Sequence, residues 1–254
     1  MSSSTSTDAS FKHHVQNYWP SIAPYIAPPI AAAGAIVPAF RDLSAKSDLQ
    51  KGLSVASMTL KEHIQGGLKI APVTGAVVGS QMIIQSMVLR ALKENPDKPS
   101  LSAVVASSAA VGVVSSPLLA VFNGLTMKMG VMEAYRKLTT RQRVAITIQE
   151  TFFVGGLSIG DKLAEVMKQQ FGDHKVIDYV AAFFSGATGS LFGHPFNTAL
   201  TRWQNDMTME GFNMAGVKQS MWGALHKARA IGCFSVVYKL GKEILMPKKE
   251  TSEK

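Results

Sequence analysis

Long stretches without a charged residue are the feature that most restricts how this chain can fold. Four such stretches have about 20 residues or more: Ser21–Phe40, Ile70–Leu89, Pro99–Met127 and Tyr179–Thr201. A helix of that length can cross a hydrocarbon layer of roughly 30 Å. Pro99–Met127 has no charge on any helical face, whereas a surface helix of a soluble protein needs a polar face. These stretches therefore predict membrane-spanning helices.

Two weaker stretches bring the number of candidate spans to six. Val144–Gly160 is interrupted only by Glu150, and Met221–Tyr238 carries three basic side chains. The alternative is a soluble all-α protein with six buried helices. The absence of amphipathic stripes favours membrane spans over that alternative.

Composition separates the function classes. Charged residues make up 17% of the chain, against about 25% in an average soluble domain, and the net charge is +9. A basic chain suits nucleic acid, anionic lipid or an anionic substrate, but no dense Lys/Arg run, zinc spacing or RNA-binding motif favours nucleic acid. A single cysteine, Cys233, excludes an intrachain disulfide and a multi-cysteine metal site. No nucleophile, phosphate-binding or His-Glu metal motif predicts catalysis, so we expect neither an enzyme nor a cofactor.

Three prolines mark an internal repeat. Pro38, Pro117 and Pro195 lie 79 and 78 residues apart, and each closes an odd-numbered apolar stretch after a glycine and small residues. A fixed period of this kind indicates a repeat architecture. We therefore predict an all-α integral membrane protein with six transmembrane helices, arranged as three repeats of helix pairs around a central cavity. The expected units are a disordered tail 1–18, repeats 19–94, 95–172 and 173–246, and a polar tail 247–254.

The third proline opens a segment that resembles a known signature. The mitochondrial carrier signature has a proline followed by an acid at +2, bases at +5 and +7, and glutamine at +9. Pro195, Arg202 and Gln204 match it, whereas Asn197 replaces the acid and Leu200 replaces the first base. Two further segments are similar to the family's sixth span and to the glycine-basic turn before an even span: Trp222–Tyr238 and Gln65–Lys69.

The first two repeats depart from the signature. Their acid and first base positions hold apolar residues: Phe40, Leu43, Leu119 and Phe122. In the family, these charges are implied to form ion pairs that close the cavity on the matrix side. Apolar residues predict an apolar plug instead. Either weaker contacts gate transport, or alternating access has been lost.

The resemblance implies a substrate site in the even spans. Glu150 and Thr151 fall at the family's contact position in the fourth span, and Lys227 and Arg229 at the corresponding level of the sixth. An ionisable group inside a span is costly, which makes it a functional candidate. A Glu opposite a Lys/Arg pair fits a zwitterion or an anion with a proton, and equally an internal salt bridge or interfacial bases.

A residual closure is expected near the loop face. Arg202 is alternatively a base that extends to the membrane interface, and His194 is expected to be an ordinary helix-end residue. The candidate gate consists of the three repeat prolines and three polar residues: Pro38, Pro117, Pro195, Asn197, Arg202 and Gln204.

Two membrane functions and a soluble alternative remain. The resemblance implies a monomeric, multi-pass solute carrier of the mitochondrial inner membrane, which exchanges a small anionic or zwitterionic metabolite and contacts membrane lipid. The lost charges favour instead a carrier-like scaffold, adaptor or insertase without a transport cycle, as in the mitochondrial outer membrane. The third alternative is a soluble helical protein. Lys and Arg are in excess in the loops within each helix pair, which marks that side as the positive-inside face.

Overall fold

The computed structural model describes residues 5–95, 99–211 and 213–246, and every secondary-structure element in these ranges is a helix. The long helices are α1 (Thr5–Gln50), α2 (Leu60–Ala91), α3 (Leu101–Thr126), α5 (Thr140–Phe171), the consecutive pair α6 (Lys175–Phe192) and α7 (His194–Gln204), and α9 (Ala224–Leu245). Two short helices complete the set: α4 (Val131–Arg136) and α8 (Met214–Ser220).

Six of the long helices form a closed ring. Each packs against the next in the order α1, α2, α3, α5, α6 and α9, and α9 returns to α1. Helices α1 and α9 are antiparallel, because Trp19 Nε1 donates a hydrogen bond to the carbonyl of Leu245 at 3.0 Å, near one end of the pair. Near the other end, Asp42 accepts bonds from His226 and Arg229. Contacts between the first and last helices therefore close the ring.

Fewer helices qualify as membrane spans than the six predicted. By length and composition, α1 from Tyr18 onward, α2 and α3 are apolar enough to cross a membrane. Helices α6 and α7 add a fourth span if the pair, bent by 57°, counts as one. Helices α5 and α9 fall short because Glu150, and Lys227 with its basic neighbours, lower their hydropathy. The chain is thus an all-helical protein with three to four candidate spans.

The prediction that the repeat prolines close their helices is wrong for two of the three. Pro38 lies inside α1, which continues to Gln50, and Pro117 lies inside α3, which continues to Thr126. A proline removes only one backbone donor, and packed neighbours can support the freed carbonyl. Only Pro195 stands at a helix break, because it lies in the first turn of α7 directly after α6 ends. The backbone N–H groups of a first helical turn have no partner within the helix, so a proline there costs no hydrogen bond.

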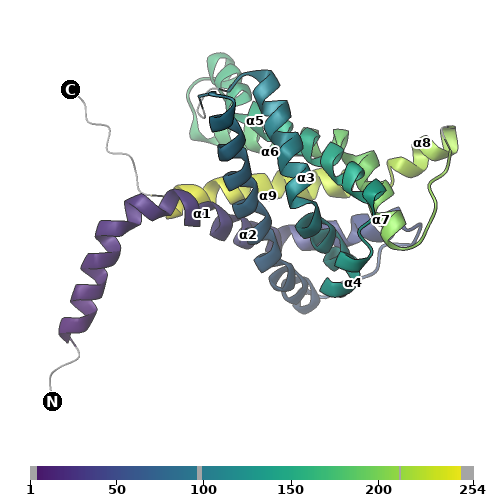
Figure 1. Cartoon of the computed structure of the whole chain (residues 1–254), viewed down its shortest axis with the longest axis horizontal. Coiled ribbons are helices and arrows are strands. Elements are labelled where there is room, and N and C mark those ends of the chain that lie inside the picture. The colour runs from purple at the N-terminus through teal and green to yellow at the C-terminus, as the bar shows by residue number, and fades with distance from the viewer. Residues whose placement is uncertain (1–4, 96–98, 212, 247–254) are drawn as a thin grey trace.

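The two predicted tails have different outcomes. Helix α1 begins at Thr5, so it includes most of the segment 1–18 for which a disordered tail was predicted, whereas residues 1–4 and the predicted polar tail 247–254 lie outside the described residues. The first turns of α1 extend away from the ring, and the helix bends before joining it (Figure 1). Four prolines lie in this half of the helix and provide a cause for the bend: Pro20, Pro24, Pro28 and Pro29.

Glycines allow the closest helix contacts. A Cβ atom built on Gly156 of α5 would lie 2.6 Å from the Cα atom of Gly189 of α6, and one on Gly112 of α3 would lie 2.7 Å from the Cα atom of Thr147 of α5. Such distances leave no room for a side chain. Close backbone approach at small residues is typical of helices packed in lipid. These glycines set the position of α5 against its two neighbours.

Candidate functional site

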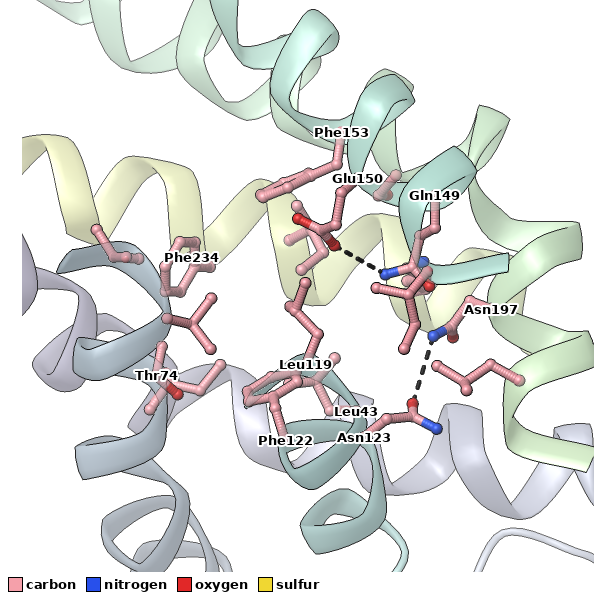
Figure 2. Close-up of a pocket in the computed structure, with 18 of the residues that line it drawn as sticks. Leu43, Thr74, Leu119, Phe122, Asn123, Gln149, Glu150, Phe153, Asn197 and Phe234 are labelled. Atoms are coloured by element: carbon pink, nitrogen blue, oxygen red, sulfur yellow. Dashed lines mark hydrogen bonds between the residues drawn. The ribbon is translucent and has the colours of Figure 1, made fainter. Parts of the chain in front are cut away.

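A cavity of about 100 Å³ lies inside the ring. All seven long helices contribute to its lining, which combines apolar side chains with nine polar ones. Figure 2 shows Glu150 and Gln149 entering from α5, and Asn123 and Asn197 from the opposite side. The remaining polar lining residues are Lys46, Thr74, Gln81, Ser190 and Lys227.

Glu150 and Lys227, two of the predicted substrate contacts, both line this cavity. Glu150 is 3% exposed, and its carboxylate accepts hydrogen bonds from Gln81 Nε2 at 3.0 Å and from Gln149 Nε2 at 3.1 Å. Lys227 is 6% exposed, and its Nζ has no hydrogen-bond partner among the described residues. The two side chains do not form an ion-pair contact with each other. The cavity therefore presents a carboxylate and an ammonium group that are not bonded to each other.

The other two predicted substrate contacts do not join this pair. Thr151 donates to the carbonyl of Thr147 one turn earlier in its own helix. The Arg229 side chain is 59% exposed and pairs with Asp42 of α1 outside the cavity lining. Arg229 therefore joins α9 to α1 and does not contribute to the cavity lining.

The floor of the cavity is a network of buried amides. Asn123 Nδ2 donates to Gln204 Oε1 at 2.7 Å and to Thr201 Oγ1 at 3.2 Å. Asn197 Nδ2 donates to Asn123 Oδ1 at 3.3 Å (Figure 2). Gln204 Nε2 donates in turn to the carbonyl of Ala120 at 3.0 Å. These bonds join α3 to α7.

Helix α1 enters the same network through two side chains. Lys46 Nζ donates to Asn123 Oδ1 at 3.3 Å and to Asn197 Oδ1 at 3.1 Å. Gln50 accepts from Thr201 Oγ1 at 2.8 Å. Lys46 and Asn123 are separated by 77 residues, and Asn123 and Thr201 by 78, which is close to the spacing of the repeat prolines. We call Lys46, Gln50, Asn123, Asn197, Thr198, Thr201 and Gln204 the polar closure.

Apolar residues pack beside the polar closure. Leu43 is buried in the main core together with Phe40, and Leu119 is buried in a second cluster with Leu200. Phe122 packs against the main core and also lines the cavity. The positions where the carrier signature has charges therefore make apolar contacts in this chain.

Arg202 and His194 are both buried. Arg202 Nη1 donates to the carbonyl of Gln50 at 3.1 Å, and its Nε donates to the carbonyl of Thr208 at 2.8 Å. This side chain joins the end of α1 to the loop after α7. The Nε2 atom of His194 lies 2.9 Å from the carbonyl of Trp222, so His194 connects α7 to the start of the last helix.

Two bases on the loop side, Lys137 before α5 and Arg141 in its first turn, hold the end of α7. Lys137 Nζ donates to the carbonyl of Gln204 at 3.1 Å and to Asp206 Oδ2 at 2.8 Å, and the Asp206 bond raises the pKa of the ammonium. Arg141 lies over the Trp203 ring, 4.9 Å from its centroid. The last turn of α7 is thus fixed on the loop side.

Two larger cavities lie away from the polar closure. One helical turn beyond Gln81, Gln85 lines a second cavity of about 710 Å³, and Lys242 lines a third of about 620 Å³. Asp161 of α5 borders both of these cavities. They lie toward the end of the ring where Trp19 meets Leu245. The two larger cavities therefore lie at the opposite end of the ring from the polar closure, and one of about 330 Å³ lies on the loop side.

Sequence patterns missed several members of the site. Lys46 and Gln50 follow Pro38 but do not stand at signature positions. They lie in the polar segment between the apolar stretches that end at Phe40 and begin at Ile70, where a loop is expected. Asn123 gave one usable signal, because it is the only amide side chain in the charge-free stretch Pro99–Met127. Such a lone polar group in an apolar helix needs a partner.

Comparisons with known proteins add no family assignment. No protein-family model matches the sequence, and no curated protein matches it. Among the described residues, no three His, Cys, Asp or Glu side chains are grouped as metal ligands. Function is therefore inferred from the site itself.

Proposed function

We propose that the chain is a transmembrane transporter of mitochondrial-carrier type, which exchanges a small anionic or zwitterionic metabolite by alternating access. One observation carries the proposal: Glu150 and the unbonded Lys227 lie in a central cavity that is closed at one end. Burying an ammonium without a hydrogen-bond partner is costly. A ligand carboxylate that entered the cavity would supply that partner.

The proposal takes α5 and α9 as the fourth and sixth spans along the chain. Helix α5 has 32 residues and α9 has 22, so both are long enough to cross a membrane. Polar groups inside spans are tolerated when they face a cavity within the protein rather than lipid. Glu150 and Lys227 satisfy that condition because both line the central cavity. Contacts at separations of 77 and 78 residues support the threefold repeat.

The cavity favours a small solute. Its volume of about 100 Å³ is below the range of roughly 300–1,000 Å³ typical of drug-sized ligands. Lys227 can bind a ligand carboxylate. Glu150 can bind a ligand ammonium when it is ionised, and it can donate a hydrogen bond to a neutral ligand acceptor when it is protonated. We therefore propose small carboxylic acids and amino acids as the substrate classes. Nucleotides, which are larger, serve as the comparison in the test.

The test combines thermal unfolding of purified protein in detergent with exchange in liposomes. A carboxylate or amino acid from a broad panel should raise the melting temperature and exchange across the bilayer. Lys227→Gln should abolish both effects, whereas Arg229→Gln should retain them because Arg229 lies outside the cavity. If the wild-type protein exchanges no nucleotide, carboxylate or amino acid, the transport proposal fails.

A carrier-like scaffold or insertase without a transport cycle is the second candidate. The observation that favours it is the apolar packing of Phe40, Leu43 and Leu119, where a carrier cycle would use charges. This candidate predicts one conformer and no stabilisation by small solutes. A second conformer trapped by a ligand would count against it.

Membrane location has its own test. Alkaline carbonate extraction should leave the chain in the membrane pellet, whereas a soluble helical protein would be released. Fractionation of mitochondria would then separate the inner membrane, which the transport proposal implies, from the outer membrane, which the scaffold implies.

A further inference from the structure

Lys46 is a buried basic side chain without a counter-charge. It is 2% exposed, and its Nζ is held by two neutral amide oxygens, Asn123 Oδ1 and Asn197 Oδ1. Within the described part of the chain, no carboxylate lies within 4.0 Å of this ammonium. Buried charges are normally paired, so a lysine in this position needs a further explanation.

Lys46 is part of both the polar closure and the cavity lining. Its amide partners lie on α3 and α7, so its two bonds join three helices of the polar closure. The same side chain lines the central cavity together with Lys227 and Glu150. An ammonium group has three N–H donors, and the two amide oxygens take two of them. One donor therefore remains for a ligand in the cavity.

We propose that Lys46 is the residue through which a carboxylate in the cavity loosens the polar closure. This inference rests on the transport function proposed above and deepens it. A bond from an ammonium to a carboxylate is about twice as strong as one between neutral groups, so a ligand carboxylate competes with the amide oxygens for Lys46. When the ammonium turns toward the ligand, Asn123 and Asn197 lose their bonds from Lys46, which are two of the contacts that join α1 to α3 and α7.

The charge of the cavity selects the ligand class. Lys46 and Lys227 supply two ammonium groups, and Glu150 supplies one carboxylate. A ligand carboxylate placed between the two lysines satisfies both. An additional ligand ammonium near Glu150 is compatible with this placement, so simple carboxylates and amino acids share the trigger.

A buried thiol in the closure can report its opening. Ser47 is fully buried, and its hydroxyl lies 3.1 Å from that of Thr126 in α3. In a Cys233→Ser background, Ser47→Cys therefore places the single thiol beneath the closure. The measurement is the rate at which a water-soluble maleimide labels it, with sodium succinate or sodium glutamate and with sodium chloride as the control salt.

We expect succinate or glutamate to raise the labelling rate about tenfold, the factor that the loss of one or two hydrogen bonds produces. Lys46→Gln keeps donors for the two amide oxygens but removes the charge, and it should abolish the increase. Lys46→Arg should restore part of it. Lys51→Met removes a loop-side charge that pairs with Asp48, and it should leave the increase intact.

Liposome exchange by the same variants separates the two proposals. If wild-type protein exchanges carboxylates and Lys46→Gln exchanges them equally well, the role of Lys46 is refuted and transport stands. If anions open the closure through Lys46 but no solute is exchanged, the transport proposal fails and the trigger stands. If anions never change the labelling rate, the trigger is refuted. A comparable melting temperature for the Gln and Arg variants shows that each is folded.

Discussion

Replacing Asn123 by leucine should destabilise the bundle more than a matched change outside the polar closure. Asn123 is buried and makes four side-chain hydrogen bonds, two as donor and two as acceptor. Leucine has the same number of side-chain heavy atoms and the same branching at Cγ, so the main loss is hydrogen bonding rather than packing. The change also leaves Lys46 with Asn197 as its single partner within the described residues.

The expected size follows from these bonds. A buried hydrogen bond contributes about 1 kcal/mol, and an unsatisfied buried partner costs about 1–3 kcal/mol. Four lost bonds predict a destabilisation of about 4 kcal/mol. For domains of about 150–250 residues, each kcal/mol lowers the melting temperature by about 2–4 °C, so a decrease of about 10 °C is expected.

Thermal unfolding in detergent measures this decrease, and Asn205→Leu is the matched control. Asn205 lies at the end of α7, where its Nδ2 donates to the carbonyl of Thr201 at 2.8 Å and contacts the sulfur of Met127. Its loss should lower the melting temperature by about a third as much as Asn123→Leu. Equal decreases for the two variants would show that the amide network does not hold the helices together.

Three further changes test other parts of the structure. Gly156→Leu should abolish the folded monomer on size-exclusion chromatography, whereas Gly155→Leu should be tolerated because a side chain there meets no atom within 4 Å. Glu150→Gln should reduce exchange of amino acids more than tenfold while exchange of simple carboxylates is retained, because a ligand ammonium loses its counter-charge. The Ser100 hydroxyl and backbone N–H donate to the Glu94 carboxylate and lower its pKa below the ordinary value of 4.5. The bonds between Glu94 and Ser100 therefore stabilise the folded chain fully at pH values above 4.5, and they are lost as the pH falls through the lowered pKa of Glu94. Hydrogen exchange of the connection between α2 and α3 should show this loss, and it should be smaller in Ser100→Ala.

Apolar length predicted the class of fold but not the helix ends. The helical, partly membrane-compatible character follows from stretches such as Pro99–Met127, whose composition leaves few alternatives. Helix α1 runs ten residues past its predicted span, from Phe40 to Gln50, because polar residues continue a helix once packing supports it. Helices α4 and α8 were not predicted, since six or seven residues give too little periodicity to detect.

The candidate site was predicted where a charge interrupts an apolar helix. Glu150 and Lys227 are conspicuous for that reason, and the structure places both in the cavity. Arg229 lies only two residues from Lys227, but two residues correspond to about 200° around a helix, so it points elsewhere. Lys46 was missed because its partners are 77 and 151 residues away, and its own neighbourhood is polar.

A closure built around a single cation also responds to an electric field. A ring of balanced ion pairs has no net charge, so a voltage across the membrane exerts no net force on it. Moving one elementary charge through 100 mV is worth about 2.3 kcal/mol, and even about a quarter of that path changes the equilibrium between closed and open forms roughly threefold. In an energised membrane, a transporter of the kind proposed above would therefore open in a voltage-dependent way through Lys46, even when the exchanged solutes carry equal charge.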